Sequence, residues 1–176
     1  MRTFVICSIL VAAPFGWASA QTAAPKKNVQ HAHEHGGAKL NIAIEGKEAT
    51  IELETPADGI VGFEHAAVSD ADKKRQSTAL DTLKNRIAEM VVFDRSAACT
   101  FTARRVAVEK DPDEGHSDVK AEFGVNCGKP PAGTQLRFGF TKIFPRIVEV
   151  EVQLLNGDQQ TGVKIHNDGG SIALSR

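Results

Sequence analysis

Apolar and polar residues alternate along several stretches of this chain, as they do in strands that bury one face. The clearest stretch is 38–55, in which Leu40, Ile42 and Ile44 alternate with polar neighbours and the alternation resumes after a Glu-Gly-Lys-Glu turn. This pattern predicts an antiparallel hairpin with one buried face. Further strand-like runs occupy residues 99–109, 119–125, 136–140, 148–154, 163–165 and 172–174.

One segment, residues 69–92, has a helical period instead. Ser69 and Asp72 resemble a capping box, with Asp in place of the usual Glu or Gln, and apolar residues such as Leu83 and Ile87 then recur at helical spacing. The helix has a single apolar face and should pack on a sheet. Together the elements indicate an α+β fold, a twisted antiparallel β-sheet or β-sandwich with one amphipathic helix packed on a face.

The first twenty residues have the features of an export signal. Arg2 supplies a positive charge, residues 4–13 are apolar, and residues 18–20 read Ala-Ser-Ala, a typical cleavage site. The apolar run is too short to span a bilayer, and no later segment is long enough. We therefore expect a signal peptide over residues 1–20 that is removed after Ala20, and no membrane insertion.

The segment between this signal and the first predicted strand carries three histidines. It contains few large apolar residues, so we expect residues 21–37 to form a disordered arm ahead of one domain at 38–176. In an extended chain His31, His33 and His35 would lie on one face, roughly 6.5–7 Å apart. Neutral imidazole suits zinc, copper and nickel, so the arm is predicted to bind metal.

Three further histidines lie in the predicted domain. His65 follows Glu64, a carboxylate that could also coordinate, although His65 could instead be a structural histidine bonded to a backbone carbonyl. His116 precedes Asp118 by two residues, so both could face one ion, although a solvated hairpin tip explains them as well. His166 precedes a turn, and we interpret it as structural.

Cys99 and Cys127 are the two cysteines that follow the signal, and each lies at the end of a strand-like run. An even number of cysteines in an exported chain predicts a disulfide. Such a bond would close a loop of about 28 residues and contribute roughly 2–4 kcal/mol. Two free thiols, or a metal site that includes sulfur, are the alternatives.

Charge and motifs narrow the function. The chain has 21 basic and 22 acidic side chains and a formal net charge of −1, whereas a nucleic-acid-binding protein needs a basic face. The sequence contains no HExxH, GxSxG, P-loop or GxGxxG motif. We therefore predict no catalytic residues, no enzyme activity and no nucleic-acid partner.

Several stretches resemble the ZrgA-like family of zinc-regulated periplasmic zinc-binding proteins. They are the His-x-His-Gly-like element, LNIAIEGKEATIELETPADGIVGFEHA, HSDVKAEFGVNC and KIFPRIVEVEVQLLNGDQQTGVKI, which together cover the chain after the signal. GFEHA is the most specific of these. The loop before HSD is shorter here than in many family members and has one histidine, which favours a single defined site over a large zinc reservoir.

The resemblance implies a periplasmic accessory protein that captures zinc and supports its uptake, with a zinc importer or its binding protein as partner. The residues do not distinguish zinc from copper or nickel. Carried over position by position, the implied metal ligands are His31, His33, His35, Glu64, His65, His116 and Asp118. The alternative is a periplasmic structural or protein-interaction domain with incidental histidines, in which the exposed edge of the first hairpin accepts a partner strand.

Overall fold

A computed structural model of the chain describes residues 36–110 and 115–176. Its strands are β1 (Gly37–Glu45), β2 (Glu48–Pro56), β3 (Val91–Val92), β4 (Cys99–Lys110), β5 (Ser117–Cys127), β6 (Gln135–Phe138), β7 (Glu149–Asn156), β8 (Gln159–His166) and β9 (Ser171–Ala173). Its helices are α1 (Ala57–Ile60), α2 (Asp70–Met90) and the 3₁₀ helix η1 (Arg95–Ala97). The α+β fold class predicted from the sequence is confirmed.

The strands form two sheets. The larger has six strands in the order β4-β5-β2-β1-β7-β8, and the smaller has three in the order β3-β6-β9. All neighbouring pairs are antiparallel except β1 and β7, which run parallel. A parallel pair needs a long crossover connection, and here the chain between β1 and β7 includes α2 and most of the other strands. The large sheet is therefore mixed.

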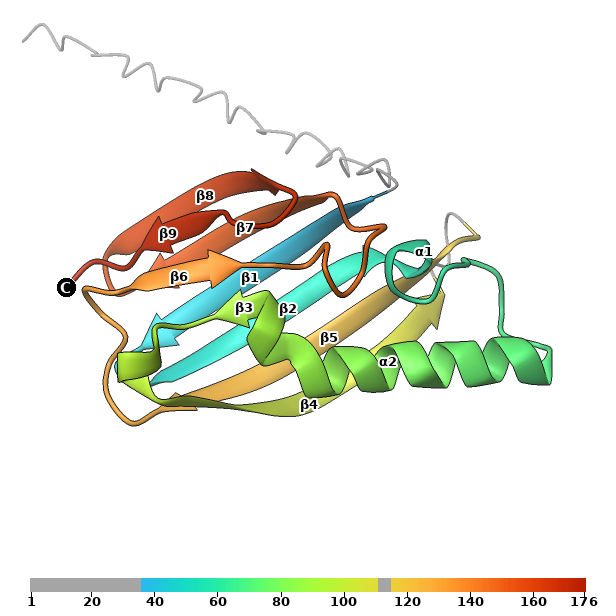
Figure 1. The fold of residues 1–176 in the computed structure, drawn as a ribbon, viewed down its shortest axis with the longest axis horizontal. Coiled ribbons are helices and arrows are strands. Elements are labelled where there is room, and N and C mark those ends of the chain that lie inside the picture. The colour runs from blue at the N-terminus through green and yellow to red at the C-terminus, as the bar shows by residue number, and fades with distance from the viewer. Residues whose placement is uncertain (1–35, 111–114) are drawn as a thin grey trace, which may run out of the picture. The chain divides into compact units, whose positions relative to one another are not determined.

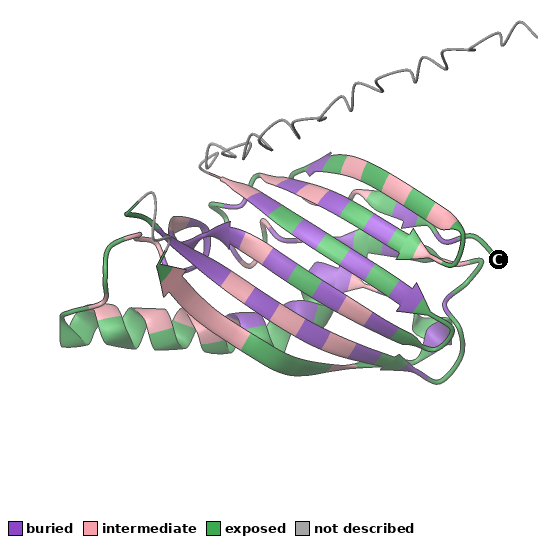
Figure 2. Cartoon of the chain, turned by 180° about the vertical axis from the view of Figure 1, so that it is seen from behind, coloured by how far each residue is buried: buried purple, intermediate pink, exposed green. Residues whose placement is uncertain are grey.

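The core lies between the large sheet and a layer made by α2 and the small sheet, which cover the same face of the large sheet (Figure 1). The opposite face is open, and Figure 2 shows buried and exposed residues alternating along its strands. In β1, for example, Leu40 and Ile42 are buried whereas Asn41 is exposed. The period of two in the sequence thus decides which side chains enter the core.

The predicted first hairpin is formed by β1 and β2, which pair from Lys39 with Glu54 to Glu45 with Glu48. Gly46 in the connecting turn has a φ of 60°, a conformation that costs glycine little. Both strands lie inside the sheet, with β7 bonded to β1 and β5 to β2. The expectation that this hairpin offers an exposed edge to a partner strand is therefore wrong, because both of its edges are already paired.

The predicted helix is α2, and its cap forms as expected, since the backbone N–H of Asp72 donates to Ser69 Oγ at 3.1 Å. Leu83, Ile87 and Met90 are its buried residues. The helix ends at Met90 rather than at residue 92, because Val91 is extended and pairs with Phe138 of β6. Here tertiary pairing overrides a locally continuous apolar pattern.

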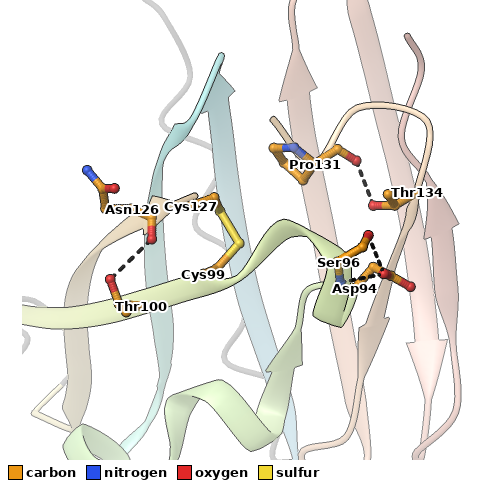
Figure 3. The surroundings of a disulfide bond; sticks show 8 residues. All are labelled: Asp94, Ser96, Cys99, Thr100, Asn126, Cys127, Pro131 and Thr134. Carbon is orange, nitrogen blue, oxygen red and sulfur yellow. Dashed lines mark hydrogen bonds between the residues drawn. A yellow bond between two sulfur atoms is a disulfide. The ribbon is translucent and has the colours of Figure 1, made fainter. Parts of the chain in front are cut away.

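Cys99 and Cys127 form the expected disulfide, and they are direct partners in the β4–β5 ladder (Figure 3). Beside it, Thr100 Oγ1 donates to the carbonyl of Asn126 at 3.1 Å. The N–H of Cys127 donates to the carbonyl of Lys47 in the turn of the first hairpin, at 2.8 Å. This end of the sheet is therefore held by a covalent bond and by backbone hydrogen bonds.

Candidate metal centre

The histidines that the structure describes all lie near the end of the large sheet opposite the disulfide. His65 follows α1 at the end of β2, His116 precedes β5, and His166 ends β8. β1 and β7 also begin at this end, since Gly37 pairs with Glu149. The strand directions bring these residues together, because β2 and β8 end at this side of the sheet and β5 begins there.

Glu64 is positioned by a short local structure between β2 and α2. α1 is followed by Gly62, whose φ of 88° turns the chain, and the N–H of Gly62 donates to the carbonyl of Asp58 at 3.0 Å. Asp58 also pairs with Arg146 at 2.7 Å, which ties α1 to the segment before β7. Glu64 then follows two residues after Gly62, with its side chain only 16% exposed.

The central contact of the candidate site joins Glu64 to His116. His116 Nδ1 lies 2.7 Å from Glu64 Oε2, and the imidazole is 52% exposed. The two residues come from separate segments, one after β2 and the other before β5, and β2 and β5 are neighbours in the sheet. A carboxylate and an imidazole are thus placed together, and both are ordinary zinc ligands.

Asp118 lies two residues beyond His116, as the second residue of β5. It pairs with Pro56 of β2 and with Glu109 of β4, and it is only 4% exposed. An aspartate is rarely so buried unless other groups compensate its charge. Asp118 therefore lies at the same sheet end as the Glu64–His116 pair, but enclosed rather than in solvent.

The ring of His65 stacks on that of Phe63, with centroids 4.5 Å apart and planes 12° apart. His65 Nδ1 lies 3.0 Å from the carbonyl oxygen of Ala66. The backbone contact is the one expected of a structural histidine. A carbonyl can only accept, so in this hydrogen bond Nδ1 carries the proton and, in a neutral ring, Nε2 carries the lone pair.

The three arm histidines, His31, His33 and His35, lie outside the described residues. The structure does show where the chain enters the sheet. The carbonyl of Gly37 accepts from Thr55 Oγ1 at 2.9 Å, and that of Gly36 accepts from the N–H groups of Val148 and Glu149 at 2.9 and 3.1 Å. Gly36 and Gly37, the first two described residues, therefore lie at the sheet end that carries Glu64 and His116.

Over residues 36–110 and 115–176, no group of three or more His, Cys, Asp or Glu side chains is close enough to hold a metal ion. The described site is thus a pair, Glu64 and His116. Structural zinc is bound by four protein ligands. By itself the pair offers two of the ligands that a zinc ion needs.

Sequence reasoning missed Glu149, which the structure places beside His166. Its carboxylate accepts a hydrogen bond from Lys164, which together with the nearby charge of Lys164 and His166 lowers the pKa of Glu149 below its usual range. A signal for this pair was present. The two-residue turn Gly157–Asp158 joins Asn156 to Gln159, and a hairpin turn sets the register that pairs Glu149 with His166.

These features define a small α+β domain with carboxylate and imidazole side chains at one sheet end. In the part of the chain that the structure describes, no helix is long and apolar enough to cross a membrane. The sequence model of a family described as "ZrgA family zinc uptake protein" matches residues 32–174. The chain belongs to this family, which is a zinc uptake family and not an enzyme family. No curated protein matches the chain.

Proposed function

We propose that this protein is exported to the periplasm, binds zinc there and supports zinc uptake by delivering the ion toward an importer or its binding protein. Membership of a zinc uptake family supports zinc as the ion that this protein binds. The signal-like residues 1–20 and the Cys99–Cys127 disulfide support an oxidising compartment outside the cytoplasm. Export is tested by sequencing the N-terminus of the protein from the periplasmic fraction, which should begin at Gln21.

The observation that carries the proposed site is the 2.7 Å contact between Glu64 and His116. The sequence predicts both residues as ligands, and the fold brings them together from two distant segments. Without metal, the imidazole and the carboxylate can share a hydrogen bond. Zinc replaces this bond by coordinating both groups, and for this the two ligand atoms must move apart to roughly 3.3–3.6 Å.

We assign the remaining ligands to His65, Asp118 and the arm. His65 has a suitable tautomer, because a ligating histidine commonly donates its other ring N–H to a carbonyl. Asp118 supplies a second carboxylate at the same sheet end. His31, His33 and His35 precede Gly36 by one to five residues in the sequence, and we include them as ligands that exchange the ion.

The test is a calorimetric zinc titration of the mature chain with the double substitution Glu64→Gln and His116→Ala. Loss of two ligands should weaken the tightest zinc site by at least about tenfold, or roughly 1.4 kcal/mol. The matched control is Glu89→Gln, which removes a carboxylate on the exposed face of α2, far along the chain from the site. Unchanged affinity in the double variant would refute the assignment of Glu64 and His116.

The contribution of the arm is tested by replacing His31, His33 and His35 with alanine in the mature chain. We expect the number of bound zinc ions or the rate of zinc exchange to fall, because imidazoles are lost from the arm alone. The folded domain keeps its core, so the unfolding free energy without zinc should not change. If this variant loses all zinc binding, the site is the arm by itself.

A further inference from the structure

A second pair of metal-ligand side chains lies on β7 and β8. Glu149 and His166 are direct partners in this antiparallel ladder, so they occupy the same face of the sheet. His166 Nδ1 lies 3.3 Å from Glu149 Oε2, whereas the distance in the Glu64–His116 pair is 2.7 Å. Two ligands of tetrahedral zinc, each about 2.0–2.2 Å from the ion, are roughly 3.3–3.6 Å apart. The longer spacing therefore suits two ligands of one ion.

The carboxylate of Glu149 already holds a cation through its other oxygen. Lys164 Nζ lies 2.7 Å from Glu149 Oε1, and the pKa of Glu149 is lowered mainly by this hydrogen bond. The carboxylate is therefore ionised at neutral pH and ready to coordinate. The Lys164 side chain is 55% exposed and that of His166 is 69% exposed, so both can move without disturbing the core. A metal ion on Oε2 would lie close to the ammonium group of Lys164. Repulsion between the two cations favours displacement of Lys164 and makes the site weaker than one without a resident cation.

This pair is separated from the Glu64–His116 pair by the width of the sheet. At this end Glu149 of β7 pairs with Gly37 of β1, and on the other side Pro56 of β2 pairs with Asp118 of β5. β1 and β2 lie between β7 and β5, which gives three strand spacings of about 4.8 Å, or roughly 14 Å. One ion cannot bridge the two pairs.

The backbone next to Glu149 is the point where the chain enters the sheet. The N–H of Glu149 donates to the carbonyl of Gly36 at 3.1 Å. Gly36 has a φ of 85°, and a Cβ there would lie 3.1 Å from a methyl carbon of Val148, so only glycine fits this approach without strain. This close approach holds the main chain of Glu149 beside Gly36. The Glu149 side chain therefore extends from a firmly held backbone.

We propose that Glu149 and His166 form a second, weaker binding site for a divalent transition-metal ion such as zinc, at which the ion displaces Lys164 from the carboxylate. Two protein ligands leave the other coordination positions to water, so an ion in this site exchanges readily. This second site is separate from the Glu64–His116 pair and does not depend on it. It also gives His166 a role other than the structural one expected from the sequence.

The test follows the imidazole signals of the mature chain by NMR during a titration with zinc chloride, with the signals assigned by single substitutions. The His166 signal should shift saturably, at zinc concentrations about tenfold or more above those that fill the tightest site. Lys164→Met should lower the concentration needed, because the competing cation is gone. Glu149→Gln should raise it by about tenfold, because a ligand is lost. Lys120→Met is the matched control, since Lys120 lies 3.5 Å from Glu54 on the same sheet and should leave the His166 curve unchanged.

The outcomes separate this proposal from the proposed function. A His166 signal that stays unchanged at millimolar zinc overturns the second site. An identical shift in the Glu149→Gln variant also overturns it, because the imidazole alone would then explain binding. If Lys164→Met leaves the curve where it was, the displacement of Lys164 is wrong. The Glu64→Gln, His116→Ala chain should lose the tight site and keep the zinc titration curve of the His166 signal. Loss of that titration curve as well would show that the two pairs are not independent.

Discussion

The two ends of the six-stranded sheet are held by different kinds of contact. At one end the Cys99–Cys127 disulfide joins β4 to β5, and the backbone of Cys127 is bonded to the turn of the first hairpin. At the other end, the carbonyl of Gly36 accepts from β7 and the residue before it, and side-chain pairs make further connections between segments. In each of these pairs the basic partner is more than half exposed. These pairs are Asp58–Arg146, Glu64–His116 and Glu149–His166.

The two ends of the sheet therefore differ in how much they contribute to the stability of the fold. A disulfide contributes roughly 2–4 kcal/mol, whereas an exposed ion pair contributes about 0–1 kcal/mol. The contacts at the histidine end can therefore be exchanged for contacts with an ion at little cost to the fold. We infer that the disulfide end keeps the sheet in register while the histidine end rearranges around zinc. Four predictions test this division.

The largest effect is expected at the disulfide end. Replacing both Cys99 and Cys127 with serine should lower the unfolding free energy by roughly 2–4 kcal/mol, because the loop between them, with a sequence separation of 28, is no longer closed. Urea unfolding measures this loss, and a thiol assay on the denatured, unreduced mature chain should find no free thiol. Zinc affinity of the folded variant should stay within about threefold of the wild type. A tenfold loss of affinity would show that the two ends are coupled.

A comparable effect should come from zinc at the other end. Zinc at about one hundred times its dissociation constant should raise the unfolding free energy by roughly 2.7 kcal/mol, because it binds the folded chain preferentially. Thermal unfolding with and without zinc measures the effect. At the same zinc concentration, the Glu64→Gln, His116→Ala chain should lose at least about half of this stabilisation. Without zinc, it should unfold at the same temperature as the wild type. Equal stabilisation of both chains would place the zinc elsewhere.

A smaller effect is expected at the cap of α2. Ser69→Ala removes the acceptor for the N–H of Asp72 and should cost about 1 kcal/mol. Ser77→Ala is the matched control, since Ser77 is exposed within the helix, where alanine is slightly favoured. Because the cap ends the loop that carries Glu64, zinc affinity should fall slightly in the Ser69 variant and not in the control. Denaturant unfolding and calorimetry separate the two effects.

The smallest effect is expected for the ion pair between α1 and the segment before β7. Arg146→Ala breaks its contact with Asp58 and should lower the unfolding free energy by less than about 1 kcal/mol, because the arginine is 61% exposed. Added salt should reduce the difference between variant and wild type, since it screens the pair. A loss as large as that of the disulfide variant would contradict the division between the two ends.

Part of the candidate site could be predicted from the sequence and part could not. Residue type and resemblance predict Glu64 and His116 as ligands, but their contact depends on β2 and β5 becoming neighbours. No local pattern encodes that pairing, because the residues come from segments far apart in the chain. Glu149 differs in this respect, since its partner follows from the turn between β7 and β8, and that signal was available.

The sequence by itself determined the elements that depend on near neighbours. Its period of two set the buried faces of the strands, its helical period and the Ser69 cap set α2, and the export context of Cys99 and Cys127 indicated their pairing. Only the tertiary structure decided the order of the strands. β1 lies inside the sheet and parallel to β7, and α2 ends at Met90 because Val91 joins another strand. Such long-range pairing depends on the burial of surfaces contributed by many segments at once, which no single stretch of sequence specifies.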